Sequence, residues 1–145
     1  VEDEISVSIN LGVDVSIPQD YINETSQRLR TYKRVSSAAD DEALERIHAE
    51  IEDRYGKIPE SVDNLFAYAR LRKFAEEMAV VSVDRAPNGI AIKLAENAKV
   101  APEKLMDVLN SYEGSAFSAN GVLRVVTNAE NPIEKAMEIL EEIRS

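Results

Sequence analysis

The sequence predicts an α+β fold: N-terminal strand segments and three helices, then two tandem ββα units forming a four-stranded antiparallel sheet with two helices on one face. Three observations predict it. Alternating apolar residues occur near the N-terminus, three segments with helical spacing follow, and from Ala79 onward a hairpin-then-helix pattern occurs twice. The 145 residues have the length of one domain, which we divide into 1–78 and 79–145.

Two short runs near the N-terminus alternate apolar and polar residues, as half-buried strands do. The first run spans residues 5–9 and the second spans residues 13–17. The tripeptide at 10–12 predicts a turn between two strands, although one long bulged strand fits equally well. Pro18 ends strand pairing because it has no N–H to donate.

The first helix is predicted from about residue 24 to residue 37. Its basic residues lie mostly off the apolar side and near the C-terminus, where the macrodipole favours cations. The third helix is predicted from 60 to 78, and its apolar surface is wide enough for a central helix with two neighbours. The apolar side of the first helix comprises Ile22, Leu29, Tyr32 and Val35.

The second helix has the clearest boundaries. Asp40 is a favourable N-cap, Gly56 suits the position after the last turn, and Pro59 follows as a second stop. Its outer faces are strongly acidic. His48, the one histidine of the chain, lies beside the apolar positions, which favours a packed, hydrogen-bonded side chain over a general base or a metal ligand. The apolar stripe comprises Leu44, Ile47, His48, Ile51 and Tyr55.

The second half contains an internal repeat. Asn88-Gly89 and Asn120-Gly121 each lie between alternating runs and predict hairpins. Helices follow at about 102–112 and from Pro132, where Asn131 is a suitable N-cap. Duplication and convergent patterning of short units both explain the repeat.

Composition excludes several classes of function. The net charge is −10, and acidic residues outnumber basic ones in both halves of the chain. Such a domain repels DNA unless one face is locally basic, and it suits docking on a basic protein surface. There is no cysteine, phosphate-binding loop, metal-ligand pattern or long apolar run, so we expect no catalysis, no cofactor and no membrane association. We expect a cytoplasmic location, and because the chain begins with Val1, a piece excised from a larger multidomain protein.

Residues 17–72 contain five specific pieces in a fixed order. These are Ile17-Pro-Gln-Asp-Tyr-Ile, Arg28-Leu, Tyr32-Lys-Arg-Val-Ser-Ser-Ala, Glu50-Ile-Glu-Asp-Arg-Tyr-Gly-Lys-Ile-Pro and Ala69-Arg-Leu-Arg. In order and approximate spacing they resemble the C-terminal domain of bacterial transcription-repair coupling factors. Asn23 stands where this family often has proline, and Ser36 where alanine is frequent. The resemblance extends at lower similarity through the hairpin-then-helix tail.

The resemblance implies a regulatory role. A full coupling factor is an ATP-dependent DNA translocase that displaces stalled RNA polymerase and recruits the damage-recognition subunit of excision repair. In the family, the C-terminal domain packs on the N-terminal module of the same chain and restrains translocation until polymerase is engaged. The resemblance therefore implies that module as the direct partner, polymerase and the repair subunit as indirect partners, and DNA contact through the parent motor only.

Two surfaces are candidates for contact. The first is the acidic face of the second helix with the loop that follows, since charge density is highest beside the family motif. Its residues are Glu45, Glu50, Asp53, Glu60 and Asp63. The alternative is an accessory module that contacts nucleic acid through a basic patch on the first and third helices. That patch comprises Arg28, Arg30, Arg34, Arg70 and Arg72.

Overall fold

The computed structural model describes residues 6–145, and its internal contacts divide the chain into two compact units. The helical unit comprises Val13–Arg70, and the sheet unit comprises the chain up to Gly12 together with Leu71–Ser145. The division falls inside helix α3 (Glu60–Glu77), so its first turns belong to one unit and its last turns to the other. The organisation as one domain stays a prediction.

The helical unit contains α1 (Thr25–Ser36), α2 (Asp41–Tyr55) and the first turns of α3. All three predicted helices are confirmed to within about one residue at each end. Apolar side chains from the three helices, from the segment before α1 and from the loop between α2 and α3 form one buried core. That core comprises Ile17, Ile22, Val35, Leu44, Ile47, Ile51, Ile58, Val62, Leu65 and Phe66.

The ends of α2 are those that the sequence predicted. The Asp40 carboxylate accepts a hydrogen bond from the Ala43 N–H at 2.8 Å, which satisfies one of the free donors of the first turn. Gly56 ends the helix with a φ of 94°, a conformation that side chains rarely adopt. The segment before α1 is bonded to the C-terminal end of α2, because the Tyr21 hydroxyl donates to the Gly56 carbonyl at 2.8 Å.

Two expectations for this unit were wrong. Residues 13–17 form no strand: Ser16 donates two hydrogen bonds to the Asp14 carboxylate, and the Ile17 N–H donates to the Tyr32 hydroxyl at 2.5 Å. The Ser16 and Ile17 N–H groups used here are donors that strand pairing would need. Leu29 is not on the buried side of α1 but 63% exposed, because the core face of that helix runs through Thr31 and Val35.

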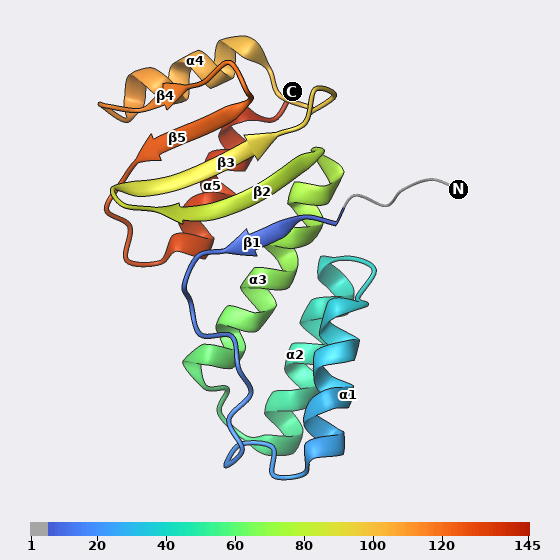
Figure 1. Cartoon of the computed structure of the whole chain (residues 1–145). Helices are drawn as coiled ribbons and strands as arrows, with labels where there is room; N and C mark the ends of the chain where they lie inside the picture. Colours follow the sequence, from blue (N-terminus) through green and yellow to red (C-terminus); the bar gives the residue numbers. More distant parts are fainter. Residues whose placement is uncertain (1–5) are drawn as a thin grey trace. The chain divides into compact units, whose positions relative to one another are not determined.

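The sheet unit contains a five-stranded sheet, and Figure 1 shows its strands side by side. The strands are β1 (Ser8–Asn10), β2 (Val80–Ala86), β3 (Gly89–Leu94), β4 (Ala116–Phe117) and β5 (Val122–Val126). Their order is β1-β2-β3-β5-β4, and the last four pair antiparallel, as the tandem ββα units predicted.

Strand β1 was not placed by the sequence. It pairs parallel with β2, with Ser8 opposite Ser82 and Asn10 opposite Asp84. The two strands are 74 residues apart and parallel, so no short turn in the sequence joins them. The alternation of apolar residues alone could therefore not identify β2 as the partner of β1. Of the predicted first strand, Ile5 lies outside the described residues.

The helices of the sheet unit cover one face of the sheet. Helix α5 (Pro132–Ile143) buries an apolar stripe, and α4 (Pro102–Ser111) packs beside it and buries Val108. Figure 1 shows α5 behind the strands. The Asn131 side chain accepts from the Glu134 N–H at 3.2 Å, as the predicted N-cap requires. The buried residues of α5 are Ile133, Ala136, Ile139, Leu140 and Ile143.

Both predicted hairpins are confirmed, but their glycines act differently. Gly121 has a φ of 84° in the β4–β5 turn, a left-handed conformation that glycine adopts without steric cost. In the β2–β3 hairpin the turn residues are Pro87 and Asn88, and Gly89 is already the first residue of β3. A β-carbon at Gly89 would lie 1.9 Å from the Val125 carbonyl oxygen. Gly89 is therefore required by the close approach of β5 rather than by the turn.

Candidate interaction surface

The five predicted acidic residues are all exposed and all belong to the helical unit, but they do not form one continuous patch. Glu45 and Glu50 are five positions apart on α2, which places them about 140° apart around the helix axis. Glu50 lies on the side of α1, and Glu45 lies on the side of α3, beside Asp63. The predicted surface therefore has two flanks.

On the flank between α1 and α2, Glu50 is paired with a base. The Arg34 guanidinium lies 2.5 Å from the Glu50 carboxylate, and the two side chains are 44% and 57% exposed. An ion pair this exposed contributes about 0–1 kcal/mol, so an incoming charged group can replace either partner at small cost. Arg30 and Arg54 line the same shallow groove.

Arg54 was not among the sequence candidates. Its position four residues after Glu50 on α2 places both side chains on one side of the helix, and this spacing was the available signal. The guanidinium also lies 5.3 Å from the centre of the Tyr55 ring.

On the flank between α2 and α3, His48 and Asp63 form a polar pair. The His48 Nε2 lies 2.8 Å from Asp63 Oδ1, and the imidazole packs edge-on against the Phe66 ring at 5.0 Å between centres. The predicted packed and hydrogen-bonded role of His48 is confirmed. A groove of about 280 Å³ runs past this pair, and Glu45 and Arg70 line it.

Asp53 and Glu60 differ from the other three acidic residues. Within residues 6–145, neither carboxylate takes part in an ion pair or a side-chain hydrogen bond. Asp53 points outward from α2, between the two flanks. Glu60 lies in the first turn of α3, where the helix macrodipole favours a negative charge.

Most arginines of the predicted basic patch already form hydrogen bonds or ion pairs with neighbouring residues. Arg28 donates to the carbonyls of Ile22 and Asn23 at 2.7 and 2.9 Å and so closes the turn that leads into α1. Arg70 lies 3.4 Å from Asp41. Arg72, which belongs to the sheet unit, bonds Glu76 at 3.2 Å and the Ser6 hydroxyl at 3.0 Å.

Arg30 is the exception. No hydrogen bond or ion pair of its side chain is found within the described part of the chain. The five arginines therefore do not form a single free basic surface within one unit.

Two side chains near these surfaces have shifted pKa values. Burial raises the pKa of the Tyr21 hydroxyl, with further contributions from Glu52, Asp63 and Tyr55. Tyr21 therefore stays protonated and keeps donating to the end of α2 throughout the neutral range. Hydrogen bonds from the Ser16 hydroxyl and N–H lower the pKa of Asp14.

Neither a metal centre nor a membrane span is found in the part of the chain that the structure describes. No group of three or more histidine and acidic side chains in residues 6–145 is arranged to hold a metal ion. None of the helices in this range is both long enough and apolar enough to cross a membrane.

Comparisons with known proteins identify the family. The family model described as the TRCF domain matches residues 11–105. The transcription-repair-coupling factors of Escherichia coli and Haemophilus influenzae are 33% and 32% identical over 101 residues, which is 70% of this chain and 9% of each relative. That of Rickettsia bellii is 29% identical over 109 residues, or 75% of this chain and 10% of the relative.

A solved structure confirms the fold. The crystal structure of the C-terminal domain of a transcription-repair coupling factor superposes with a TM-score of 0.78 at 20% identity, covering 94% of this chain and 91% of that one. The chain thus spans about a tenth of the length of its curated relatives and nearly the whole of this solved domain. On the match to residues 11–105, the chain belongs to the TRCF domain family of bacterial transcription-repair coupling factors.

Proposed function

We propose that this chain is the non-catalytic C-terminal regulatory domain of a transcription-repair coupling factor. In this role it packs on the N-terminal module of its parent chain, covers the surface that recruits the excision-repair damage-recognition subunit, and restrains DNA translocation. Engagement of RNA polymerase by the parent releases it. Enzymatic activity, ATP use and DNA contact then belong to the parent motor.

One observation carries this proposal: the carboxylates of α2 are exposed and available to a basic partner. Asp53 has no partner within residues 6–145, and Glu50 is held by a single exposed arginine. Docking a basic surface here gains charge complementarity without leaving a buried charge unpaired. A contact of this kind is specific but reversible, which a restraint that must be released requires.

The anchoring of α2 also supports the proposal. The core residues Leu44, Ile47 and Ile51 hold one side of the helix, and Tyr21 bonds its C-terminal end. These contacts keep Glu50 and Asp53, one turn apart, on a rigid element, so little conformational entropy is lost when a partner binds.

A charge-reversal experiment tests the proposal. The double variant Glu50→Lys, Asp53→Lys replaces two carboxylates with two ammonium groups on the exposed side of α2. We expect its affinity for the isolated N-terminal module of the parent, measured by calorimetry, to fall at least about tenfold, since close charge pairs at interfaces contribute on the order of 1.5 kcal/mol or more. In the full-length parent, the same substitutions should raise translocation in the absence of polymerase.

The matched control is Asp107→Lys, Glu113→Lys, which makes the same change of charge at two exposed positions of the sheet unit. The control should bind the N-terminal module as the unaltered chain does. Equal loss of affinity in both double variants would indicate a general charge effect and contradict the placement on α2. Unchanged affinity in the Glu50, Asp53 variant would contradict it directly.

The basic-patch alternative is less well supported, because Arg28, Arg34 and Arg70 already have partners in the helical unit. It predicts DNA binding by the isolated chain that weakens steeply with salt. Substitution of Arg30 and Arg54 by glutamine should then weaken that binding. Absence of DNA binding at 50 mM salt would remove this alternative without affecting the proposal above.

A further inference from the structure

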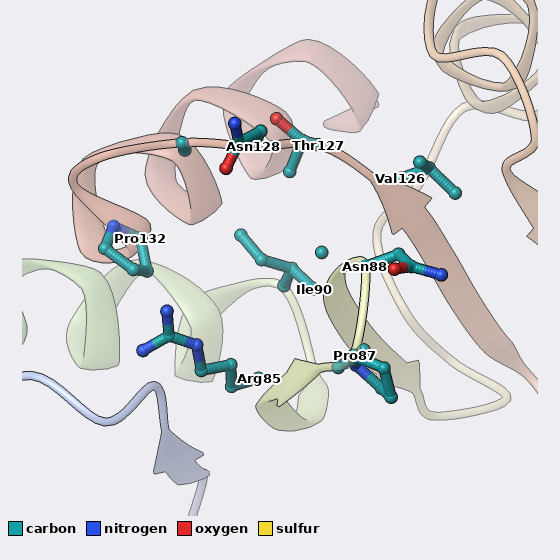
Figure 2. Close-up of a pocket in the computed structure, with 11 residues that line it drawn as sticks. Arg85, Pro87, Asn88, Ile90, Val126, Thr127, Asn128 and Pro132 are labelled. Carbon is teal, nitrogen blue, oxygen red and sulfur yellow. The ribbon is translucent and has the colours of Figure 1, made fainter.

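A pocket of the sheet unit lies at the end of the sheet, between the β2–β3 turn and the segment from β5 to α5, and has a volume of about 480 Å³. Figure 2 shows the Arg85 side chain on one side of this pocket, Asn128 on the opposite side and Ile90 between them. Asn88 and Thr127 complete its polar lining. The volume lies within the range of pockets that bind small ligands or single side chains of a partner.

Among the residues that the structure describes, Arg85 is the only charged one that lines this pocket. Within residues 6–145 its guanidinium makes no hydrogen bond and no ion pair. The chain as a whole carries a net charge of −10, yet no carboxylate of residues 6–145 lines this pocket beside the arginine. Such a guanidinium presents a fork of donors that matches a carboxylate or a phosphate.

Two glycines shape this part of the molecule. At Gly12, a β-carbon would lie 3.2 Å from Arg85 Nη1 and 3.7 Å from its Cδ, so the bare backbone leaves room for the arginine side chain. At Gly89, the missing side chain lets β3 approach the Val125 carbonyl and the Thr127 N–H, and the Thr127 N–H donates to the Asn88 carbonyl at 3.0 Å. The position of the arginine and the opposite wall are thus both set by backbone packing.

The other residues that line the pocket, together with the net charge of the protein, indicate which class of anion it binds. Val126 is 40% exposed, and together with Ile90, Pro87 and Pro132 it supplies apolar groups around the pocket (Figure 2). Multiply charged phosphates and nucleic acids are repelled by the net charge of the protein, whereas a single carboxylate is repelled least. An apolar group attached to that carboxylate gains additional burial against these apolar side chains.

We propose that this pocket binds a carboxylate that carries an adjoining apolar group, with Arg85 as the anion-binding residue and Asn88, Thr127 and Asn128 as further hydrogen-bonding groups. Such a group occurs in a partner polypeptide, as an acidic side chain beside an apolar one, and in small free carboxylic acids. The pocket lies in the sheet unit and the acidic surface of α2 in the helical unit, so this proposal is independent of the regulatory function.

The test uses the ¹⁵N-labelled 145-residue chain at pH 7 and constant ionic strength. Four probes are titrated: acetyl-Leu-Glu-Leu-amide, its glutamine counterpart, 4-methylpentanoate and inorganic phosphate. We expect the glutamate peptide or 4-methylpentanoate, or both, to produce saturable shifts of the Asn88, Thr127 and Asn128 amide signals. Binding by the peptide alone assigns the carboxylate to a partner polypeptide, and binding by 4-methylpentanoate alone assigns it to a free acid.

Substitutions of arginine identify the binding group. Arg85→Gln should weaken binding of the active probe at least about tenfold, and Arg85→Lys should weaken it less, because lysine keeps the charge but loses the fork. The matched control is Arg124→Gln, which removes the same charge from an exposed position of β5 opposite Ala91 and should leave binding unchanged.

Four results overturn the proposal. These are the absence of saturable shifts with either carboxylate, equal binding of the glutamine peptide, tighter binding of phosphate than of both carboxylates, and equal loss of binding in the Arg85→Gln and Arg124→Gln variants. The amide spectrum of each variant reports whether its fold is retained. If Arg85→Gln alters that spectrum outside the pocket, the affinities of Arg85→Lys and Arg124→Gln for the active probe are compared instead. Equal affinity in these two variants overturns the proposal.

Discussion

The substitution Gly89→Ala tests the close packing of β3 against β5. A β-carbon at this position would lie 1.9 Å from the Val125 carbonyl oxygen and 2.8 Å from the Thr127 nitrogen. Real β-carbons essentially never approach other atoms within 3.0 Å, so the two strands must separate locally by about 1.1 Å, the difference between the two distances. Both contacts are with backbone, so no side chain can rotate away to relieve them.

The expected cost follows from these contacts. Overpacking costs about 1–3 kcal/mol, and loss of the bond from Thr127 N–H to the Asn88 carbonyl, 3.0 Å long, adds about 1 kcal/mol. Alanine also lowers the conformational entropy of the unfolded chain, which stabilises the folded state by about 0.4–1 kcal/mol and offsets part of this cost. We therefore expect a net loss of about 1–4 kcal/mol in the free energy of unfolding, measured by urea denaturation.

A stabilising effect of Gly89→Ala would be informative, because it would mean that the clash is absent. Without the clash, Gly89→Ala would stabilise the protein, because the φ of Gly89 is not in the left-handed region. The control is Ala91→Gly, two residues along β3, which should cost about 0.5–1 kcal/mol through strand propensity alone. A Gly89→Ala variant as stable as the unaltered chain, or more stable, would refute the close approach of β3 and β5.

Three further predictions concern other parts of the chain. Asp40→Ala removes the N-cap of α2 and should cost about 1 kcal/mol in urea denaturation, whereas Asp40→Asn should cost much less because its side chain still accepts from the Ala43 N–H. Ile139→Ala should cost about 2–5 kcal/mol, since this side chain is fully buried, and a loss below 1 kcal/mol would place α5 outside the core. Ser16→Ala should raise the pKa of Asp14 in an NMR titration, because hydrogen bonds from Ser16 lower it. A lowered pKa stabilises the folded state at pH values above the unfolded pKa, and this contribution is lost as the pH falls through the folded pKa, so the variant should differ from the unaltered chain least at low pH. An unchanged Asp14 pKa in the variant would contradict the Ser16 contacts.

The sequence predicted the features that depend on neighbouring residues. The N-cap at Asp40, the stop at Gly56 and the cap at Asn131 are each made by groups within four positions, so short-range patterns were sufficient to locate them. The tandem hairpins were found for the same reason, because each strand pair is joined by a short turn.

The candidate surface could be predicted only in part. Charge density identified the acidic residues of α2, but it did not distinguish Glu50, which is paired with Arg34, from Asp53, which points outward. These differences depend on which helix packs on which side of α2. A linear pattern does not contain that information.

By itself the sequence determined the helices and their ends, the tandem ββα architecture and the resemblance to a family, because each of these is encoded in local spacing and residue type. Only the tertiary structure decided the parallel pairing of β1 with β2, the irregular course of residues 13–17 and the need for glycine at position 89. It also assembled the Arg85 pocket from two separate segments, 85–90 and 126–132. For the pairing of β1, for Gly89 and for the pocket the physical reason is the same: the interacting groups are far apart in the chain, and packing brings them together. Residues 13–17 combine local hydrogen bonds from Ser16 to Asp14 with the distant one from Ile17 to Tyr32.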